Sequence, residues 1–289
     1  EESARITSPT PWDIMNELMQ GGLGAGELGV VVAPAGIGKS WVLSAMGAYA
    51  ISQGLNVVHY TLELNEAYVG LRYDSIFSGV ESQNLKYHKE EVMEKLFNLK
   101  GNLTIKYYPT KSCTVNTLSA HLKKVTTFGT NVDMVLVDYA DIMRDVHKSS
   151  EMRHALGNIY EDLRGMAGEL QVPIWTASQA NRSALDEDVI EANKVAESYA
   201  KVMTADFVVS LSRKIEDKIG NTGRFHVIKN RFGPDGLTYP AKINTNIGKI
   251  EIFESNSVQG KDVQHKINNR DNQTKAILSA RYEDLMNEQ

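Results

Sequence analysis

The sequence predicts an α/β fold in which helices flank a mostly parallel central sheet, with an antiparallel extension at one side. Two observations support this prediction. Short apolar runs alternate with helical segments along most of the chain, which is the pattern of strands joined by helical crossovers. The runs that end at Asp138 and Ser178 are almost continuously hydrophobic, as expected for strands that are buried on both faces of a parallel sheet.

The chain divides into three parts. Residues 1–11 are polar and predict a linker, and residues 12–255 predict the main domain. A short helix is expected at the start of the main domain, with Thr10 as its N-cap and Pro11 as its first residue. We expect no complete domain before the main one, so that the chain is a fragment or works without such a domain.

The expected strands are short β-rich runs. Those of the parallel part are Leu28 to Ala33, Asn56 to Leu62, Leu103 to Tyr108, Met134 to Asp138, Pro173 to Ser178 and Phe207 to Leu211. Those of the antiparallel extension, which short turns connect, are Arg224 to Lys229, Leu237 to Ile243 and Lys249 to Phe253. Residues 256–289 are expected to form a polar linker that carries one amphipathic tail helix, at Thr274 to Met286.

Composition and charge limit the function classes. The single cysteine, Cys113, excludes an internal disulfide and is expected to be a small buried residue, and the histidines have no zinc-site spacing. No apolar run approaches the ~20 residues that cross a bilayer, so we expect no membrane partner and a cytoplasmic location. The net charge of −5 argues against a surface that coats nucleic acid, but not against a narrow channel with a few local cations.

A phosphate-binding loop follows the first strand of the main domain. The segment Ala33-Pro34-Ala35-Gly36-Ile37-Gly38-Lys39-Ser40 fits the pattern G-x-x-x-x-G-K-[ST], except that Ala33 stands in place of the first glycine. Its backbone N–H groups and the start of the following helix are expected to surround the phosphates of ATP or another nucleoside triphosphate. Lys39 is expected to reach the β- and γ-phosphates, and Ser40 to hold Mg²⁺. The expected nucleotide contacts are Ala35, Gly36, Ile37, Gly38, Lys39, Ser40 and Trp41.

A second carboxylate-bearing strand completes the expected metal site. Four apolar residues precede Asp138, which is expected to hold Mg²⁺ together with Ser40 at the carboxyl edge of the sheet. No glutamate follows Asp138 directly, so the general base must come from elsewhere. Glu63, at the end of the strand after the phosphate loop, is our candidate. A helix-start carboxylate is the alternative interpretation of Glu63, and Glu66 is the rival position.

Two further residues complete the expected nucleotide site. Gln179 ends another apolar strand, where its amide can bind the γ-phosphate or the attacking water; an ordinary strand-terminal glutamine is the alternative. Arg72 is our candidate for a cation that stacks on the base. No residue pattern selects ATP over other nucleoside triphosphates.

These motifs together resemble a known family. Thr61-Leu62-Glu63-Leu64 resembles the S-L-E-M motif of DnaB-type replicative helicases. Three more segments resemble their V-D-Y-L-Q-L-M, S-Q-L-N-R and K-x-R-N-G-P-x-G motifs, namely Val137 to Met143, Ser178 to Arg182 and Lys229 to Gly236. With the phosphate loop, five motifs in the family's order cover about residues 12–255. Ala196-Glu197-Ser198, where bacterial members have R-E-S, is more similar to the helicases of T-even-like phages.

The resemblance implies a RecA-like P-loop NTPase that forms a homo-hexameric ring in a phage-infected or bacterial cell. It implies ATP sites between subunits, single-stranded DNA in the central channel, and a primase and a helicase loader as partners. Lys229 and Arg231 match the catalytic cations that the family inserts into a neighbour's site; an exposed basic turn is the alternative interpretation.

The resemblance also places two DNA-contacting loops, at about residues 144–153 and 183–201. The candidate DNA contacts there are Lys148, Arg153, Lys194, Glu197, Ser198 and Lys201. Solvated helix faces explain these charges equally well, and the second loop also carries acidic residues that would repel phosphates if they faced the channel.

Two other classes of ATPase share part of this pattern. A RecA-like recombinase, which forms a filament on DNA, and a KaiC-like regulatory ATPase, whose partner is a protein, both have a phosphate loop and similar strand ends. The late segment Lys229 to Gly236 favours the helicase.

Overall fold

The structure, a computed structural model, describes residues 5–195 and 199–287, and only the backbone beyond residue 281. A nine-stranded sheet forms its centre, in the order β11-β10-β9-β8-β3-β7-β6-β4-β5. The strands of this sheet are β3 (Leu28–Ala33), β4 (Val57–Thr61), β5 (Leu103–Tyr107), β6 (Met134–Asp138), β7 (Ile174–Gln179), β8 (Phe207–Ser212), β9 (Thr222–Asn230), β10 (Thr238–Asn244) and β11 (Lys249–Ile252).

The strand directions agree with the sequence prediction. Strand β3 lies parallel to both β7 and β8, and β6, β4 and β5 continue the parallel part, whereas β8 to β11 pair antiparallel. In this register Ala33 lies opposite Gln179, and Thr61 lies opposite Asp138. The ends of β3, β4, β6 and β7 therefore meet at one edge of the sheet, where ligands bind in open α/β folds.

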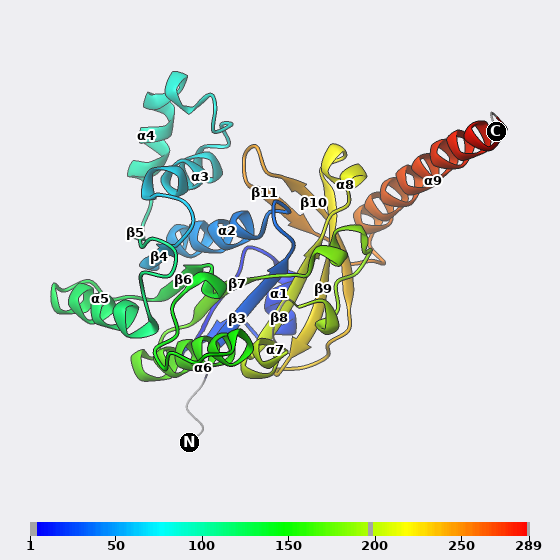
Figure 1. Cartoon of the computed structure of the whole chain (residues 1–289). Coiled ribbons are helices and arrows are strands. Elements are labelled where there is room, and N and C mark those ends of the chain that lie inside the picture. Colours follow the sequence, from blue (N-terminus) through cyan, green and yellow to red (C-terminus); the bar gives the residue numbers. More distant parts are fainter. Residues whose placement is uncertain (1–4, 196–198, 288–289) are drawn as a thin grey trace.

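Helices cover both faces of the sheet (Figure 1). On one face, α1 (Asp13–Leu18), α2 (Lys39–Ser52) and α3 (Glu66–Ser78) pack over one hydrophobic core; on the other, α5 (Val115–Thr127), α6 (Met152–Leu170) and α7 (Ala200–Thr204) pack over a second. Val30 and Val32 of β3 point to one core and Val31 to the other, which is the alternation of a strand buried on both faces. Short elements complete the chain: η1 (Leu85–Tyr87), α4 (Lys89–Phe97), η2 (Ala140–Ile142), η3 (Arg182–Asp186), η4 (Ala192–Lys194) and α8 (Ile215–Ile219).

The amino-terminal segment differs from the prediction. Helix α1 has Trp12 rather than Thr10 as its N-cap. Asn16 bonds both the backbone N–H and the carbonyl of Thr10, at 2.7 and 2.9 Å, which holds Thr10 outside the helix. Before it, β1 (Thr7–Ser8) pairs with β2 (Leu23–Gly24), and Arg5 forms an ion pair with Glu27 at 2.6 Å. The described part of the expected linker is therefore docked on the domain.

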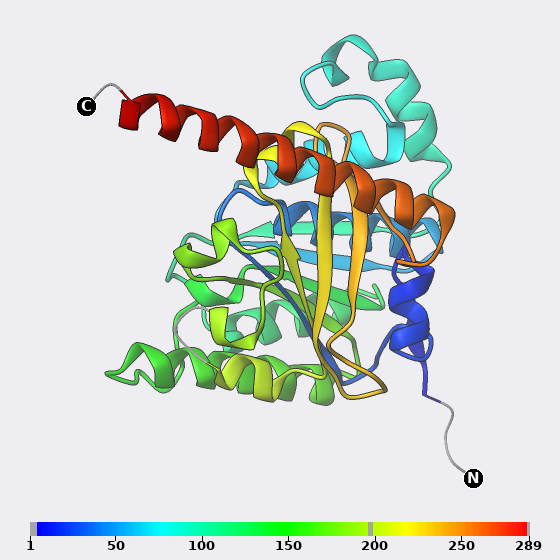
Figure 2. The same ribbon diagram turned by 90° about the vertical axis from the view of Figure 1, so that its right-hand side faces the viewer.

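The carboxyl-terminal segment also differs from the prediction. A single helix, α9, spans Val258–Asn287 where a linker and a shorter helix were expected. Ser257 accepts a hydrogen bond from the N–H of Gly260 at 2.9 Å, which is an N-cap contact. Val263 and Ile267 are fully buried against the domain, and the rest of the helix projects away from it (Figures 1 and 2). The sequence does not predict the burial of Val263 and Ile267, because two apolar residues in a polar segment do not form a recognisable amphipathic pattern.

Cys113 is buried, as predicted, and burial raises the pKa of its thiol to about 11. No helix in the described residues is long and apolar enough to cross a membrane.

Candidate nucleotide site and nucleic-acid face

The phosphate loop connects β3 to α2 at the carboxyl edge of the sheet. Gly36 and Gly38 have φ values of 73° and 121°, a region that favours glycine. Gly38 is the N-cap of α2, so the positive end of this helix faces the loop. Lys39 is the first residue of α2 and is only 7% exposed. The sequence prediction that Ala33 can replace the first glycine is compatible with this geometry, because Ala33 is still part of β3.

Arg213, which follows β8, is hydrogen-bonded to the phosphate loop and to two other segments. Its guanidinium donates to the carbonyl oxygens of Ile37, Ile243 and Thr222 at 3.4, 3.3 and 2.9 Å. Burial lowers the pKa of this group, and nearby Asp217 opposes the shift. The sequence analysis missed Arg213 because its partners are backbone carbonyls from distant segments, which leave no local pattern.

Ser40 and Asp138 have the arrangement of a Mg²⁺ site. The Ser40 side chain is hydrogen-bonded to the Asp138 carboxylate, and burial raises the pKa of that carboxylate, while Ser40, Arg72 and Lys39 oppose the rise. In the described part of the chain, Asp138 Oδ1 is buried and has no hydrogen-bond partner. A buried carboxylate oxygen and a hydroxyl are donors that suit a hard divalent cation, so these residues fit the ion.

A cavity of about 370 Å³ lies in front of the loop. Tyr139 forms one wall, with its ring 4.5 Å from Lys39 Nζ and its hydroxyl 3.4 Å from Gln179 Oε1. Further lining residues are Ala35, Gly36, Gly38, Ser40, Trp41, Glu63, Leu64, Arg72, Arg213, Lys218 and Thr245. The structure thus brings the predicted loop residues, apart from Ile37, together with Glu63, Arg72 and Gln179 around one cavity. The Ile37 side chain is buried in the core and does not line the cavity. The sequence did not predict three of the lining residues, namely Tyr139, Lys218 and Thr245. Lys218 and Thr245 come from the distant β8–β9 and β10–β11 connections.

Glu63 and Glu66 have different environments. Glu63 follows β4, is exposed, and lines the cavity. Glu66 is the first residue of α3, and its carboxylate accepts a hydrogen bond from the N–H of Tyr107 at 3.0 Å. Glu66 is thus occupied by the neighbouring strand, and this geometry favours Glu63 as the candidate base.

Arg72 lies on the carboxylate side of the cavity. Its guanidinium is 5.2 Å from the centre of the Trp41 ring. Burial lowers the pKa of Arg72, while the charges of Asp138 and Glu63 oppose that shift. A cation this close to both carboxylates fits a phosphate contact better than the base-stacking contact that we expected from the sequence.

Lys229 and Arg231 lie at the other end of the sheet. Arg231 pairs with Asp206 at 2.8 Å, and the same carboxylate accepts a hydrogen bond from the N–H of Leu28, the first residue of β3. Lys229 donates to the carbonyl oxygens at the end of α7, Val202 and Met203. The phosphate loop begins at the opposite end of β3, roughly 17 Å away at the rise of a β-strand. These cations therefore lie far from the phosphate loop of their own chain.

The candidate DNA contacts are not all accessible. Lys148 and Arg153 are exposed on the first loop, and Lys194 is half-buried and pairs with Glu187 at 2.7 Å. Lys201 is wrongly predicted as a DNA contact, because its side chain is only 1% exposed and pairs with Asp141 at 3.0 Å. Glu197 and Ser198 lie outside the described residues.

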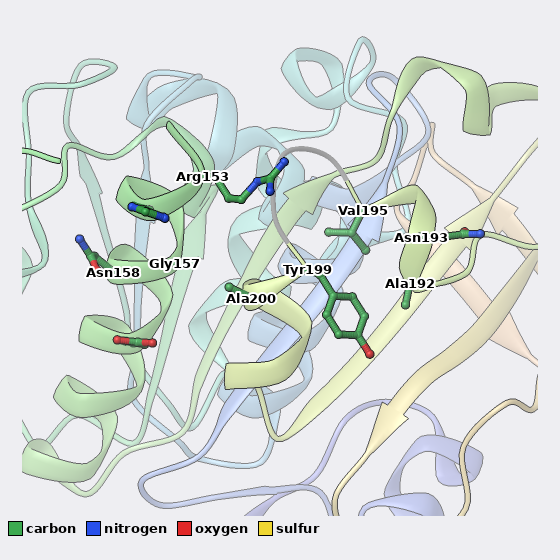
Figure 3. A pocket seen from close by; sticks show the side chains of 10 residues that line it. Arg153, Gly157, Asn158, Ala192, Asn193, Val195, Tyr199 and Ala200 are labelled. Atoms are coloured by element: carbon green, nitrogen blue, oxygen red, sulfur yellow. The ribbon is translucent and has the colours of Figure 1, made fainter. Parts of the chain in front are cut away.

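A larger cavity of about 670 Å³ lies between α6 and the second loop (Figure 3). Arg153, His154 and Asn158 of α6 line one side of it, and Asn193 and Tyr199 line the other. Tyr199 is 58% exposed. An accessible aromatic ring and a cation that line the same cavity are the kinds of group that bind the bases and phosphates of single-stranded nucleic acids. Tyr199 was not among the DNA contacts predicted from the sequence, which were charged residues and one serine.

The sequence of residues 9–247 matches the family model described as the DnaB-like helicase C-terminal domain. The chain belongs to this DnaB-like family. It is 28% identical over 238 residues to the DnaB-like replicative helicase of Enterobacteria phage T4, a match that covers 76% of this chain and 49% of that protein. It is also 25% identical over 238 residues to the replicative DNA helicase DnaB of Geobacillus stearothermophilus, with 78% and 52% covered.

Solved structures show the same fold. One of them, described as an ATPase domain, superimposes with a TM-score of 0.75 at 17% identity, over 88% of this chain and 93% of that domain. A DnaB-like replicative helicase, solved with its interactions with primase, superimposes with the same TM-score and identity, over 88% of this chain and 63% of that one. The chain spans about half the length of the curated relatives that it matches. Its residues correspond to the C-terminal domain of the family.

Proposed function

We propose that this DnaB-like domain is the ATP-driven motor of a replicative DNA helicase, which hydrolyses nucleoside triphosphate between the subunits of a hexameric ring and moves along single-stranded DNA. The observation that carries the proposal is the separation of one catalytic set into two ends of the domain. The phosphate loop and Glu63 line the cavity at the carboxyl edge, and Asp138 is hydrogen-bonded to Ser40 of that loop, whereas Arg231 is anchored beside the start of β3.

The residues at the carboxyl edge have complementary roles in the proposed reaction. The loop N–H groups and Lys39 bind the phosphates, and Ser40 and Asp138 hold Mg²⁺, which neutralises charge on the β- and γ-phosphates when bound. Glu63 accepts a proton from the attacking water. Gln179 bonds the γ-phosphate or the water, and Tyr139, between Lys39 and Gln179, keeps both side chains in place.

Lys229 and Arg231 complete the site of a neighbouring subunit. A head-to-tail contact joins two different faces, and it closes into a ring when the rotation per subunit allows. Cations that reach the γ-phosphate from the neighbour neutralise the transition state, an effect of about 10³–10⁵ in rate for arginine fingers in other NTPases. Asp206 pairs with Arg231 at 2.8 Å, and the Arg231 side chain is 45% exposed, so the arginine is accessible from outside the domain.

The face around the larger cavity is proposed to contact single-stranded DNA. Arg153 and Lys148 supply cations for phosphates, and Tyr199 supplies a ring for a base, without reading sequence. Two acidic residues of the second loop are paired with cations, Glu187 with Lys194 and Asp188 with Lys214 at 2.6 Å, which reduces their repulsion of phosphates. A primase and a helicase loader, in a bacterial or phage-infected cytoplasm, are the partners proposed from the family.

One experiment tests the proposed function. ATPase rate is measured with and without an oligothymidine, and light scattering gives the mass of the same samples. We expect stimulation by the oligothymidine together with a mass near six subunits. A hexamer without stimulation would contradict the DNA motor, and an open-ended assembly whose length follows the DNA would indicate a recombinase filament instead.

A further inference from the structure

Asp141 is the centre of a buried polar cluster that the catalytic roles above do not use. Its carboxylate accepts hydrogen bonds from the Tyr160 hydroxyl at 2.7 Å, the Ser178 hydroxyl at 3.2 Å and the backbone N–H of Gln179 at 3.0 Å, and it pairs with Lys201 Nζ at 3.0 Å. The Asp141 side chain is 11% exposed and that of Lys201 is 1% exposed. Both charges are thus largely removed from water and stabilise each other.

One partner of Asp141 lines the nucleotide cavity, and two others lie next to residues that line the larger cavity. Gln179 lines the nucleotide cavity. Tyr160 lies on α6 between Gly157 and Glu161, which line the larger cavity, and Lys201 follows Tyr199 and Ala200, which line its other side (Figure 3).

The chain after Gln179 is also tied to the second loop. The N–H of Asn181 donates to the carbonyl of Lys194 at 2.8 Å, and Ala180 forms a β-bridge with Val195. Gln179 is therefore connected to the second loop in two ways. One is the backbone pairing of the residues that follow it, and the other is its hydrogen bond to Asp141. The buried pair adds the connection to α7, because Lys201 lies in that helix.

We propose that Asp141 and Lys201 are positioning residues that couple the state of the nucleotide at Gln179 to the grip of the larger cavity on single-stranded DNA. This inference rests on the proposed function. A γ-phosphate contact that moves Gln179 displaces its N–H from Asp141, and the buried lysine follows the carboxylate because separating two opposite charges in the core is costly. Coupling of this kind is reciprocal, so DNA at the larger cavity also changes the position of Gln179.

The test compares three variants with the wild type, namely Asp141→Asn, Lys201→Met and the double variant. Each single variant breaks the buried ion pair but keeps one of its charges, and is expected to lower Tm, whereas the double variant removes both charges and is expected to regain most of the lost Tm. In all three, the ratio of DNA-stimulated to basal ATPase rate is expected to fall at least about 5-fold, the lower end of ordinary allosteric coupling. Lys123→Met, which removes the exposed pair with Glu169, is the control and is expected to change neither quantity.

The double variant separates coupling from simple structural support. If the pair only stabilises the fold, the double variant regains the DNA stimulation together with Tm, and that result would overturn the inference. As a second measurement, the affinity for a labelled oligothymidine is compared with and without a non-hydrolysable ATP analogue. The nucleotide effect on affinity should be lost in the double variant; its persistence there contradicts the coupling. A wild type without any DNA stimulation would instead overturn the proposed function itself.

Discussion

Glu63 and Glu66 lie three positions apart but differ in what their carboxylates contact. Glu63 faces the nucleotide cavity, and Glu66 is bound to the N–H of Tyr107. At the residue scale, the proposed hydrolysis therefore depends on which carboxylate remains accessible to a water molecule beside the γ-phosphate.

The Glu63→Gln variant is expected to bind nucleotide with near wild-type affinity and to lose about 10²–10⁴ in kcat, the usual contribution of a general base. Steady-state hydrolysis and the affinity for a fluorescent nucleotide measure the two effects. Glu66→Gln keeps an acceptor for Tyr107 and is the matched control, with a rate near that of the wild type. Normal turnover by Glu63→Gln would mean that another group activates the water.

The spacing of residues in the sequence predicts part of the proposed nucleotide site, such as Lys39, Ser40 and Asp138. It could not show that Lys201 is buried, because a lysine that pairs with Asp141 and one that faces a channel have the same local pattern. Arg213 was not predicted for a similar reason, because its hydrogen-bond partners are backbone carbonyls from separate segments, which have no local sequence pattern.

At the element scale, β4 and α3 pack through a buried histidine. His59 on β4 is hydrogen-bonded to the Tyr73 hydroxyl on α3 at 2.8 Å. Burial lowers the pKa of His59 to about 3, and the charge of Arg72 adds to the shift. The buried environment of this contact therefore favours the neutral imidazole.

This contact predicts a pH dependence of stability. Because the folded-state pKa of His59 lies below its unfolded value of 6.5, the unfolded chain binds more protons in the window between them. The stabilisation is complete above pH 6.5 and is lost as pH falls towards 3, with a slope of up to about 1.4 kcal/mol per pH unit. Urea unfolding at several pH values between 5 and 7.5 measures this slope, and His59→Gln should flatten it. An equal slope in the variant would assign the pH dependence to other groups.

Helix α9 shows why element boundaries were harder to predict than strand order. The parallel strands are continuous apolar runs, whereas α9 has few apolar residues and is held by Val263, Ile267 and an ion pair between Asp271 and Arg224 at 3.6 Å. The pattern of a linker and the pattern of a sparsely anchored helix are nearly the same in a sequence.

Two truncations test how α9 is anchored. Removal of residues 272–289 is expected to leave the free energy of unfolding nearly unchanged, because this part projects from the domain (Figure 2). Removal of residues 258–289 also takes away Val263 and Ile267 and should cost about 3–6 kcal/mol, from the burial of two large aliphatic side chains. Equal stability of the two truncated chains would show that these residues do not anchor the helix.

At the scale of the whole molecule, the catalytic set is distributed over both ends of the domain. Lys39 lies after the last residue of β3, and Arg231 lies beside its first residue through Asp206. From the sequence, the prediction that Arg231 acts on a neighbouring subunit rests on the family resemblance alone. The structure adds a physical reason, because the length of β3 separates Arg231 from Lys39. No single chain can bring these two ends together without breaking β3 out of the sheet.

The measurement that tests this claim most directly is the ATPase rate of a mixture of Lys39→Ala and Arg231→Ala chains, which are both expected to be inactive alone. In freely mixed rings with independent sites, about one quarter of the interfaces combine an intact Lys39 with an intact Arg231 from the neighbour in a head-to-tail arrangement. A 1:1 mixture should therefore recover about one quarter of the wild-type rate, provided that light scattering shows mixed assemblies. If such assemblies form and the mixture is no more active than its two components, Arg231 does not act in the site of a neighbouring subunit.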